Sequence, residues 1–206
     1  MSEQSRLRLD PDHWEQRYVD GSIPWDTGEP DPHLRHFLSS FAPAPCKTLE
    51  IGCGTGTNAT WLQSLGFEVT GIDVSATAIE RSRVRAREEE QACRLEVADL
   101  RDQDIPGGPF QLAYDRGCFH LFEDQDSSHF AGRIAHHLGM DGLWCSLLGS
   151  TDGPPRETGP PRRSATAIMA AIEPHFEVLE LMSCFFDEGS HSDARAWLLV
   201  ARKRTP

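Results

Sequence analysis

The stretch from residue 48 to residue 58 constrains this chain more than any other. An apolar run with Glu50 near its end leads into glycines at every second position, Gly52, Gly54 and Gly56. Alternating glycines allow a sharp turn, a close approach of the backbone to a ligand, and exposed amide groups at the start of the next helix. The pattern therefore predicts a strand, a nucleotide-type turn and a helix, with a carboxylate at the entrance.

The same alternation of strand and helix continues along the chain. Strands are expected at about 47–51, 67–72, 95–98, 110–114 and 143–148, and helices at about 56–65, 75–92, 127–138 and 165–172. Two apolar runs, 176–186 and 194–201, flank a polar turn and predict a hairpin. The alternation predicts an α/β fold, a parallel sheet with helices on both faces, which binds ligands at the carboxyl ends of its strands.

Two further helices are expected before the first strand. One begins at Asp10-Pro11, because an acidic cap followed by proline favours a helix start. The other is expected near Pro32 to Phe41, because Leu34, Phe37 and Leu38 stand at helical spacing. Between them, the turn at 21–30 holds Trp25, which is either a plug over the core or a cover for a ligand. Late in the chain, the proline-rich loop 149–163 is long enough to be a flap.

Composition narrows the class of protein. A length of 206 residues with 38% hydrophobic content suits a single domain over 1–206, with 1–44 as an N-terminal helical lid and 45–206 as the core. The net charge of -12 opposes binding to nucleic acid or to an anionic membrane, and no apolar run reaches the roughly 20 residues of a membrane span. Six cysteines without a Cys-x-x-Cys pair, and no signal peptide, indicate reduced thiols in a cytoplasm. The histidines lack metal-ligand spacing, so no metal site is expected.

Four acids end predicted strands: Glu50, Asp73, Asp99 and Asp115. Because the carboxyl ends of parallel strands lie along one edge, these acids should converge on one rim. Each acid taken singly could be a helix cap or a turn residue. Together with the glycine-rich turn, they predict a ligand site.

The negative charge of this rim distinguishes between two candidate cofactors. A dinucleotide would need Gly-x-Gly-x-x-Gly, whereas here the third glycine, Gly56, comes one residue early. Its pyrophosphate would also face Glu50, and like charges repel by about 1 kcal/mol at 4 Å even in water. S-adenosylmethionine has no phosphate and carries two cationic groups. Asp73 suits its ribose diol and Asp99 its adenine amino group, with Leu100 against the ring. The sequence predicts S-adenosylmethionine.

The motifs resemble those of class I S-adenosylmethionine-dependent methyltransferases. The resemblance rests on Glu50-x-Gly52-x-Gly54-x-Gly56, on Asp73 and Asp99, and on the final hairpin, and it covers about 45–203. It implies a Rossmann-like, doubly wound, seven-stranded sheet, mostly parallel with an antiparallel last strand.

A narrower resemblance points to the thiopurine methyltransferase-like group, which includes thiol, halide and chalcogen methyltransferases. It is carried by Trp14-Glu15-x-Arg17-Tyr18, Pro24-Trp25-Asp26-x-Gly28 and Asp115-Arg116-Gly117-Cys118-Phe119-His120. In that group the Trp-Asp segment covers the cofactor, which implies that Trp25 lies near the methionine part and the sulfonium. The expected cofactor-binding residues are Trp14, Tyr18, Trp25, Glu50, Gly52, Gly54, Gly56, Asn58, Asp73, Val74, Asp99, Leu100 and Asp115.

Methyl transfer requires the acceptor in line with the S–CH₃ bond, so the protein must mainly aim the acceptor. A thiol with a pKa near 8.5 is only a few per cent thiolate at neutral pH, and a nearby cation raises that fraction. Arg116 is the candidate cation, and His120 could remove the proton or orient the acceptor. With the adjacent rim acid Asp115, these are the expected catalytic residues. The alternatives are that Arg116 pairs with a rim acid and that His120 is a packed residue.

The leading hypothesis is a cytoplasmic S-adenosylmethionine-dependent methyltransferase acting on a small-molecule thiol, a metabolite or toxic compound, as a monomer or weak homodimer. One alternative is a methyltransferase for a chalcogen oxyanion, a halide or another O or N acceptor. A second is a non-catalytic S-adenosylmethionine-binding protein. A third, disfavoured by Glu50 and Gly56, is a nicotinamide oxidoreductase.

Overall fold

Seven strands and six α-helices make up the described part of the chain. The structure, a computed structural model, describes residues 9–153, 159–186 and 194–205. The strands are β1 (Lys47–Ile51), β2 (Glu68–Asp73), β3 (Arg94–Val97), β4 (Phe110–Arg116), β5 (Leu138–Gly149), β6 (Phe176–Phe185) and β7 (Arg195–Lys203). The helices are α2 (Pro11–Val19), α3 (Pro32–Phe41), α4 (Thr57–Ser64), α5 (Ala76–Glu88), α6 (Asp124–His137) and α7 (Ala165–Ile172), with a 3₁₀ helix η1 (Phe119–Leu121).

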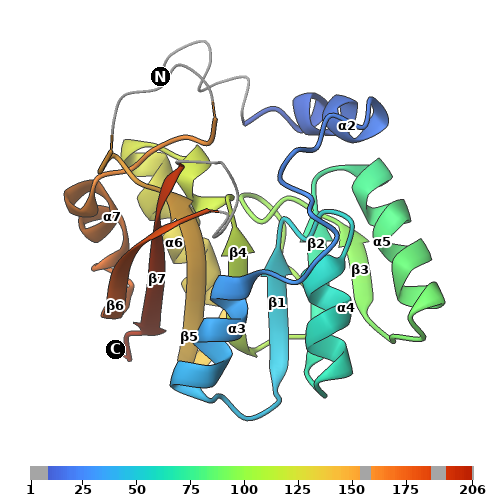
Figure 1. Ribbon diagram of the computed structural model, residues 1–206. Coiled ribbons are helices and arrows are strands. Elements are labelled where there is room, and N and C mark those ends of the chain that lie inside the picture. The colour runs from blue at the N-terminus through green and yellow to red at the C-terminus, as the bar shows by residue number, and fades with distance from the viewer. Residues whose placement is uncertain (1–8, 154–158, 187–193, 206) are drawn as a thin grey trace.

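The strands form one sheet in the order β3-β2-β1-β4-β5-β7-β6 (Figure 1). Strand β7 runs antiparallel to both of its neighbours, and the other pairs are parallel. This confirms the expected mostly parallel α/β sheet with a reversed last strand. The order changes direction at β1 and β4, and a sheet of this kind binds its ligand at that switch point. None of the described helices is long and apolar enough to cross a membrane.

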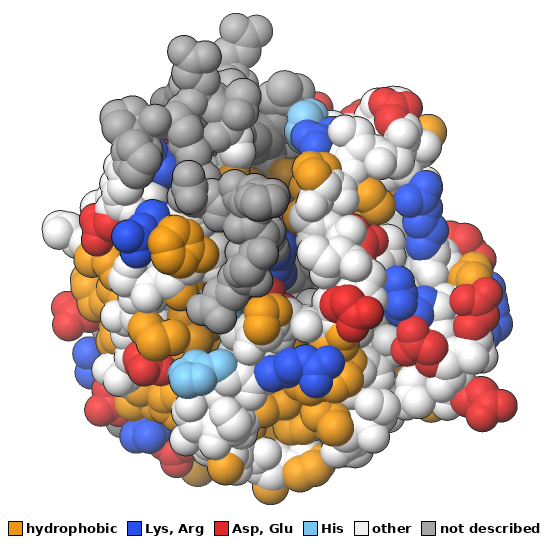
Figure 2. Space-filling model, in the orientation of Figure 1, with side chains coloured by type: hydrophobic (Ala, Val, Ile, Leu, Met, Phe, Trp, Pro, Cys, Tyr) orange, Lys and Arg blue, Asp and Glu red, His pale blue; other side chains and the backbone are white. Residues whose placement is uncertain are grey.

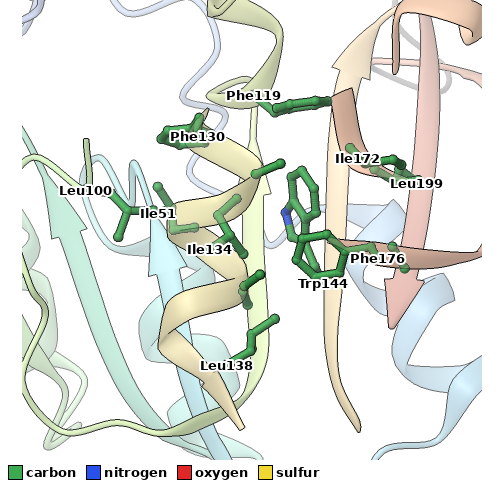
Figure 3. Packing of buried hydrophobic residues seen from close by; sticks show 14 of the residues in the cluster. Ile51, Leu100, Phe119, Phe130, Ile134, Leu138, Trp144, Ile172, Phe176 and Leu199 are labelled. Carbon is green, nitrogen blue, oxygen red and sulfur yellow. The ribbon is translucent and has the colours of Figure 1, made fainter. Parts of the chain in front are cut away.

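Two hydrophobic clusters cover the two faces of the sheet. On one face, α6 and α7 pack around Trp144 of β5, which is fully buried against Phe119 and Phe176 (Figure 3). On the other face, α3, α4 and α5 supply the second cluster, with Leu34 and Phe37 of α3 completely buried. The helices therefore lie on both faces, as predicted, and this rigid two-sided packing fixes the loops at the carboxyl edge of the strands.

Helix α5 ends earlier than the sequence predicted. Expected to run to about residue 92, it ends at Glu88, because Glu90 adopts a positive φ of 56° that stops the helix. Its start was predicted correctly, with Ser75 as the cap. The many charges of α5 are of mixed sign, and Figure 2 shows red and blue side chains interspersed on the side where α5 lies. Most are exposed, as expected for a solvated helix face.

Strand β5 begins earlier than predicted, at Leu138 rather than near residue 143. Leu138 pairs with Phe110, and the register then shifts before Leu112 pairs with Leu143. Asp141, with a positive φ of 56°, lies within this irregular part of the strand. Residues 139–142 were expected to lie between the helix and the strand, yet pairing with β4 holds the segment in the sheet as a bulge.

The base of the proline-rich loop is tied down. Arg163 donates its backbone N–H to the carbonyl of Gly149 at 2.7 Å, and Thr151 donates to the carbonyl of Arg163 at 3.1 Å. Residues 154–158, in the middle of the predicted flap, lie outside the described residues.

Candidate active site

The glycine-rich turn after β1 forms the floor of the candidate site. Gly52, Gly54 and Gly56 all have a positive φ, at 67°, 55° and 84°. The side chain of Cys118 lies against Gly52, so that a Cβ at this glycine would fall 2.2 Å from the sulfur. The turn is thus closely packed from below.

Glu50 places a buried carboxylate at the base of this turn. The residue is 3% exposed, and its Oε2 atom has no hydrogen-bond partner among the described residues. Burial raises the pKa of Glu50 to about 8, against a hydrogen bond from Asn58 that lowers it, and the nearby charge of Asp73 raises it further. A buried acid with an unpaired oxygen is unfavourable in itself and becomes favourable when a cation binds beside it.

Asp73, at the end of β2, is held by backbone amides. Its Oδ2 accepts from Gly54 N and its Oδ1 from Ser75 N, both at 2.9 Å. Burial raises its pKa to about 6, although these hydrogen bonds act in the opposite direction. The carboxylate has further lone pairs and is 7% exposed, so it remains able to accept from a diol. Val74, next in the chain, is half-buried.

Asp99 and Leu100 lie at the end of the β3 side of the rim. Both oxygens of Asp99 accept from Arg101, two residues on. Burial alone would raise the pKa of Asp99, but the hydrogen bonds and charge of Arg101 outweigh burial and lower it. Leu100 is 2% exposed and packs in the core with Ile51, so its side chain supports the rim from below.

Three aromatic side chains from the N-terminal region cover the turn. Trp25 packs edge-on against Trp14 and Tyr18, with ring centroids 5.6 and 6.2 Å away. Tyr18 places its hydroxyl directly over Gly54, where a Cβ would approach it to 2.8 Å. Burial, together with the charge of Asp73, raises the pKa of Tyr18, which keeps the hydroxyl neutral. The predicted aromatic residues thus meet over the predicted glycines.

Glu15 attaches this aromatic cover to the start of α5. From α2, its Oε2 accepts from the Ser75 hydroxyl at 2.6 Å and from Thr77 N at 3.1 Å, which caps α5 with a side chain from another helix. The Ser75 and Thr77 hydrogen bonds lower the pKa of Glu15. Arg81 of α5 completes the attachment by donating to the carbonyl of Tyr18 at 2.8 Å.

Asp115, at the end of β4, lies inside the protein. It is completely buried, its Oδ1 accepts from Cys118 N and Phe119 N at 3.1 and 3.0 Å, and its Oδ2 accepts from Trp144 Nε1 at 2.9 Å. Burial raises its pKa, and these donors act against that rise. Asp115 therefore shapes the turn that leads into η1, and its carboxylate is not exposed on the rim.

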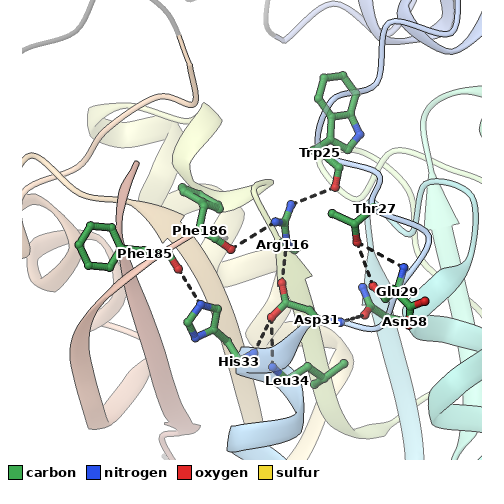
Figure 4. A network of polar contacts seen from close by, with 10 residues as sticks. All are labelled: Trp25, Thr27, Glu29, Asp31, His33, Leu34, Asn58, Arg116, Phe185 and Phe186. Atoms are coloured by element: carbon green, nitrogen blue, oxygen red, sulfur yellow. Dashed lines mark hydrogen bonds and ion pairs between the residues drawn. The ribbon is translucent and has the colours of Figure 1, made fainter. Parts of the chain in front are cut away.

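Arg116 joins three distant segments at the carboxyl end of β4 (Figure 4). Its Nε donates to Asp31 Oδ2 at 2.6 Å, its Nη1 to the carbonyl of Trp25 at 3.3 Å, and its Nη2 to the carbonyl of Phe186 at 3.4 Å. Arg116 therefore pairs with an acid, as the alternative expected, but not with one of the rim acids. The acid is Asp31, which the sequence analysis did not select.

Asn58 links this network to the glycine-rich turn. Its Oδ1 accepts from the backbone N–H of Asp31 at 2.9 Å (Figure 4). Its amide nitrogen is left to donate to Glu50. A continuous chain of contacts therefore runs from Glu50 through Asn58 and Asp31 to Arg116.

His120 lies in η1 beside Phe186, 4% exposed, with ring centroids 5.8 Å apart. Its Nδ1 accepts the backbone N–H of Gly149 at 2.9 Å. The ring is thus fixed between the end of β5 and the end of β6. No group of three or more His, Cys, Asp or Glu side chains within the described residues is arranged to hold a metal ion.

The structure brings together most of the predicted site residues and adds two that were missed. Glu50, Asp73, Trp25 and their glycine neighbours meet at one place, whereas Leu100 and Asp115 are buried beneath it. Glu15 was visible only as part of the Trp14 motif. Asp31 was not selected; its place before Pro32 is that of a helix cap, and nothing in this position points to Arg116.

The fold and this rim define the class of protein. A seven-stranded sheet with β7 reversed, a glycine-rich turn after β1, and acids at Glu50 and Asp73 match the Rossmann-like architecture of class I methyltransferases. The chain belongs to the thiopurine S-methyltransferase family, whose model matches residues 9–192. The family resemblance drawn from the motifs is thereby confirmed.

Two relatives that are named as methyltransferases, and one solved structure, are similar to this chain. The chain is 30% identical over 152 residues to "Probable thiol methyltransferase 2" of Arabidopsis thaliana, covering 72% of this chain but only 65% of that protein, just under two thirds. It is 33% identical over 159 residues to "Thiocyanate methyltransferase 1" of Brassica oleracea, covering 75% of this chain and 68% of that protein. A solved structure, described as "Conversion of a Disulfide Bond into a Thioacetal Group during Echinomycin Biosynthesis", superposes with a TM-score of 0.76 at 25% identity, covering 87% and 84% of the two chains.

Proposed function

We propose that this protein transfers a methyl group from S-adenosylmethionine to a small-molecule thiol. The assignment of S-adenosylmethionine as the cofactor rests on the buried carboxylate of Glu50. One oxygen of this carboxylate has no hydrogen-bond partner among the described residues and lies beside the glycine-rich turn. An ammonium or sulfonium group placed there would pair with it and favour the ionised form. The same carboxylate would repel a pyrophosphate.

The protein's own residues divide into two sets. Trp14, Tyr18 and Trp25 would cover the cofactor, so that residues 1–44 act as a lid, of which 1–8 are outside the described residues. The proposed cofactor contacts are Glu50, Gly52, Gly54, Gly56, Asn58, Asp73, Val74 and Asp99. Leu100 supports this rim from the core, and Asp115 positions the turn that carries Arg116 and His120.

The thiol acceptor is supported by what the relatives are named for, a thiol in one case and thiocyanate in another. In the reaction, a sulfur lone pair of the acceptor attacks the methyl carbon, the bond from that carbon to the sulfonium sulfur breaks with its electron pair staying on S-adenosylhomocysteine, and the thiol proton leaves to water. Arg116 and His120 would orient the acceptor in line for this displacement.

Several finer points belong to the same proposal. A cytoplasmic location fits the six cysteines, which form no disulfide in the described structure. A role in detoxification would suit a small thiol acceptor. The net charge of -12 supports a small-molecule partner over nucleic acid, and we expect a monomer or weak homodimer.

Two measurements test the proposal. Calorimetry should show binding of S-adenosylmethionine by the wild type and weaker binding by Glu50→Gln. A panel assay of S-adenosylhomocysteine release should then show turnover with thiols above halides, selenite and tellurite. Turnover only with an alcohol, amine or carboxylate would overturn the thiol assignment. Binding without turnover of any acceptor would favour a non-catalytic binding protein, and absence of binding would overturn the cofactor as well.

A further inference from the structure

The cation on the acceptor side of the rim is paired with a buried carboxylate. Arg116 Nε lies 2.6 Å from Asp31 Oδ2, and the side chains of Arg116 and Asp31 are 16% and 2% exposed. A carboxylate at this distance cancels most of the attraction that the guanidinium would exert on another anion. As a unit, the pair carries no net charge.

Among the described residues, two further buried acids lie close to the pair along the chain or through the hydrogen-bond network. The next residue back, Asp115, is a buried acid, and Glu50 is connected to Asp31 through one side chain, Asn58. The whole chain carries a formal net charge of -12. An acceptor bearing a second negative charge would therefore approach acids together with a cation that is already neutralised.

We propose that Asp31 is a positioning residue that determines specificity: by holding and neutralising Arg116, it makes the site favour thiols without a second negative charge over acceptors that carry one. The inference rests on the proposed function, because it concerns the acceptor of the same site. The reaction is unchanged, with the new S–CH₃ bond formed by the acceptor sulfur and the proton released to water.

The two oxygens of Asp31 have separable tasks. Oδ1 caps α3 by accepting from His33 N at 2.7 Å and Leu34 N at 3.3 Å, whereas Oδ2 holds Arg116. Asparagine retains a capping oxygen but turns an N–H group toward the Arg116 N–H, so Asp31→Asn removes the ion pair and keeps the cap. Serine also caps a helix but is too short to reach Arg116, which makes Asp31→Ser a second variant of the same kind.

The test compares two thiols of similar length, 2-mercaptoethanol and 3-mercaptopropionate, of which only the second carries a carboxylate. Both are mainly protonated thiols at neutral pH. The wild type should have the higher kcat/KM for 2-mercaptoethanol. In Asp31→Asn and Asp31→Ser, the preference should move toward 3-mercaptopropionate by about tenfold or more, since the carboxylate of Asp31 no longer offsets the charge of Arg116. In the double variant Asp31→Asn with Arg116→Gln, the shift should disappear.

A control variant distinguishes this change in acceptor preference from a general loss of folded protein. Asp104→Asn releases Arg133 from a pair 2.8 Å long, with Asp104 76% exposed, and should leave the preference unchanged. A wild-type ratio retained in both folded Asp31 variants, or a shift that persists in the double variant, would overturn the inference. A wild type that binds no S-adenosylmethionine and methylates no thiol would instead overturn the proposed function, and the inference with it.

Discussion

The two halves of the sheet's carboxyl edge are built in different ways. On the side of β1 and β2, contacts join residues close in sequence, as when Asp73 accepts from Gly54 across 19 positions. On the side of β4 and β6, they join distant ones: Arg116 reaches Asp31 across 85 positions, and His33 donates to the carbonyl of Phe185 across 152. The hydrogen bonds within the floor of the proposed cofactor side are therefore local, although Glu15 attaches its aromatic cover across 60 positions. The proposed acceptor side exists only once the whole chain has folded.

The two sides also differ in how their buried acids are paired. Glu50 keeps one oxygen without a partner among the described residues, whereas Asp115 has three donors and Asp31 has its cap and Arg116. An unpartnered buried acid destabilises the empty protein and favours a cationic ligand, whereas a paired acid stabilises the fold. Binding and stability should therefore respond oppositely to mutation on the two sides.

The largest effect should come from filling the glycine-rich turn. In Gly56→Ala, the new Cβ would lie 2.8 Å from Cβ of Ser82 at a φ of 84°, so α5 must move. We expect a loss of about 4 kcal/mol in the free energy of unfolding, from left-handed strain and overpacking together. Urea unfolding measures it. Gly28→Ala, with a φ of 73° and no atom within 4 Å, is the control and should lose only about 1–2 kcal/mol. Equal losses would show that close packing is not what the turn requires.

Asp115→Asn should give the next largest effect. The amide would direct an N–H group at a donor, either Trp144 Nε1 or the backbone N–H groups of Cys118 and Phe119. We expect a loss of about 3 kcal/mol in the free energy of unfolding. The exposed Asp104→Asn should change it by no more than about 0.5 kcal/mol. If the Asp115→Asn protein were stable but inactive, Asp115 would act in the reaction rather than in stabilising the fold.

The empty protein should lose stability as the pH rises. The folded-state pKa values, about 8 for Glu50 and about 6 for Asp73, exceed their ordinary values of 4.5 and 3.8. Between each pair of values the folded state holds a proton that the unfolded state has released, so the free energy of unfolding falls across that window. Thermal unfolding from pH 4.5 to 8 should show the decline.

The variant Glu50→Gln measures how much of this pH dependence of stability is due to Glu50. At pH 8 it should stabilise the unliganded protein by about 2 kcal/mol, with the difference gone near pH 4.5. It should also bind S-adenosylmethionine more weakly. Calorimetry of the wild type near pH 7, in two buffers of different ionisation enthalpy, should detect a proton released on binding that the variant does not release. If the variant bound S-adenosylmethionine with the wild-type affinity and released the same proton, Glu50 would not be a contact of the cofactor.

The smallest effect concerns the attachment of the lid. Glu15→Gln removes a negative charge from the start of α5, where Glu15 accepts from Ser75 and Thr77. We expect about 1 kcal/mol of lost stability, concentrated in α2, and faster amide exchange there. The exposed Glu88→Gln, at the other end of α5, should leave exchange in α2 as it is.

Sequence reasoning succeeded where structure is local. Strand β1 and the turn at Gly52, Gly54 and Gly56 follow from neighbouring residues alone, and both were predicted. The early start of β5 at Leu138 was missed, because pairing with β4 overrides the turn chemistry of Asp141. Local propensity is a weak guide where tertiary packing acts against it.

The site shows the same limit. The acids and glycines of the cofactor side could be ordered by strand topology, which places them on one edge. Asp31 could not be assigned to Arg116, since the two residues are 85 positions apart in the chain and only the folded structure brings them together. Asp115 was placed on the rim because it ends a strand, yet the indole of Trp144 draws it inward.

The hydrogen bond from Gly149 to His120 fixes the tautomer of the imidazole. A backbone N–H can only donate, so Nδ1 must present its lone pair at 2.9 Å. A neutral imidazole has one such lone pair, and the hydrogen therefore resides on Nε2. Held in this way, His120 has no second basic nitrogen with which to take a proton from an acceptor. His120 then does not ionise the thiol. With S-adenosylmethionine saturating, the pH profile of kcat/KM for the acceptor should follow the pKa of whichever thiol is supplied rather than a pKa of His120.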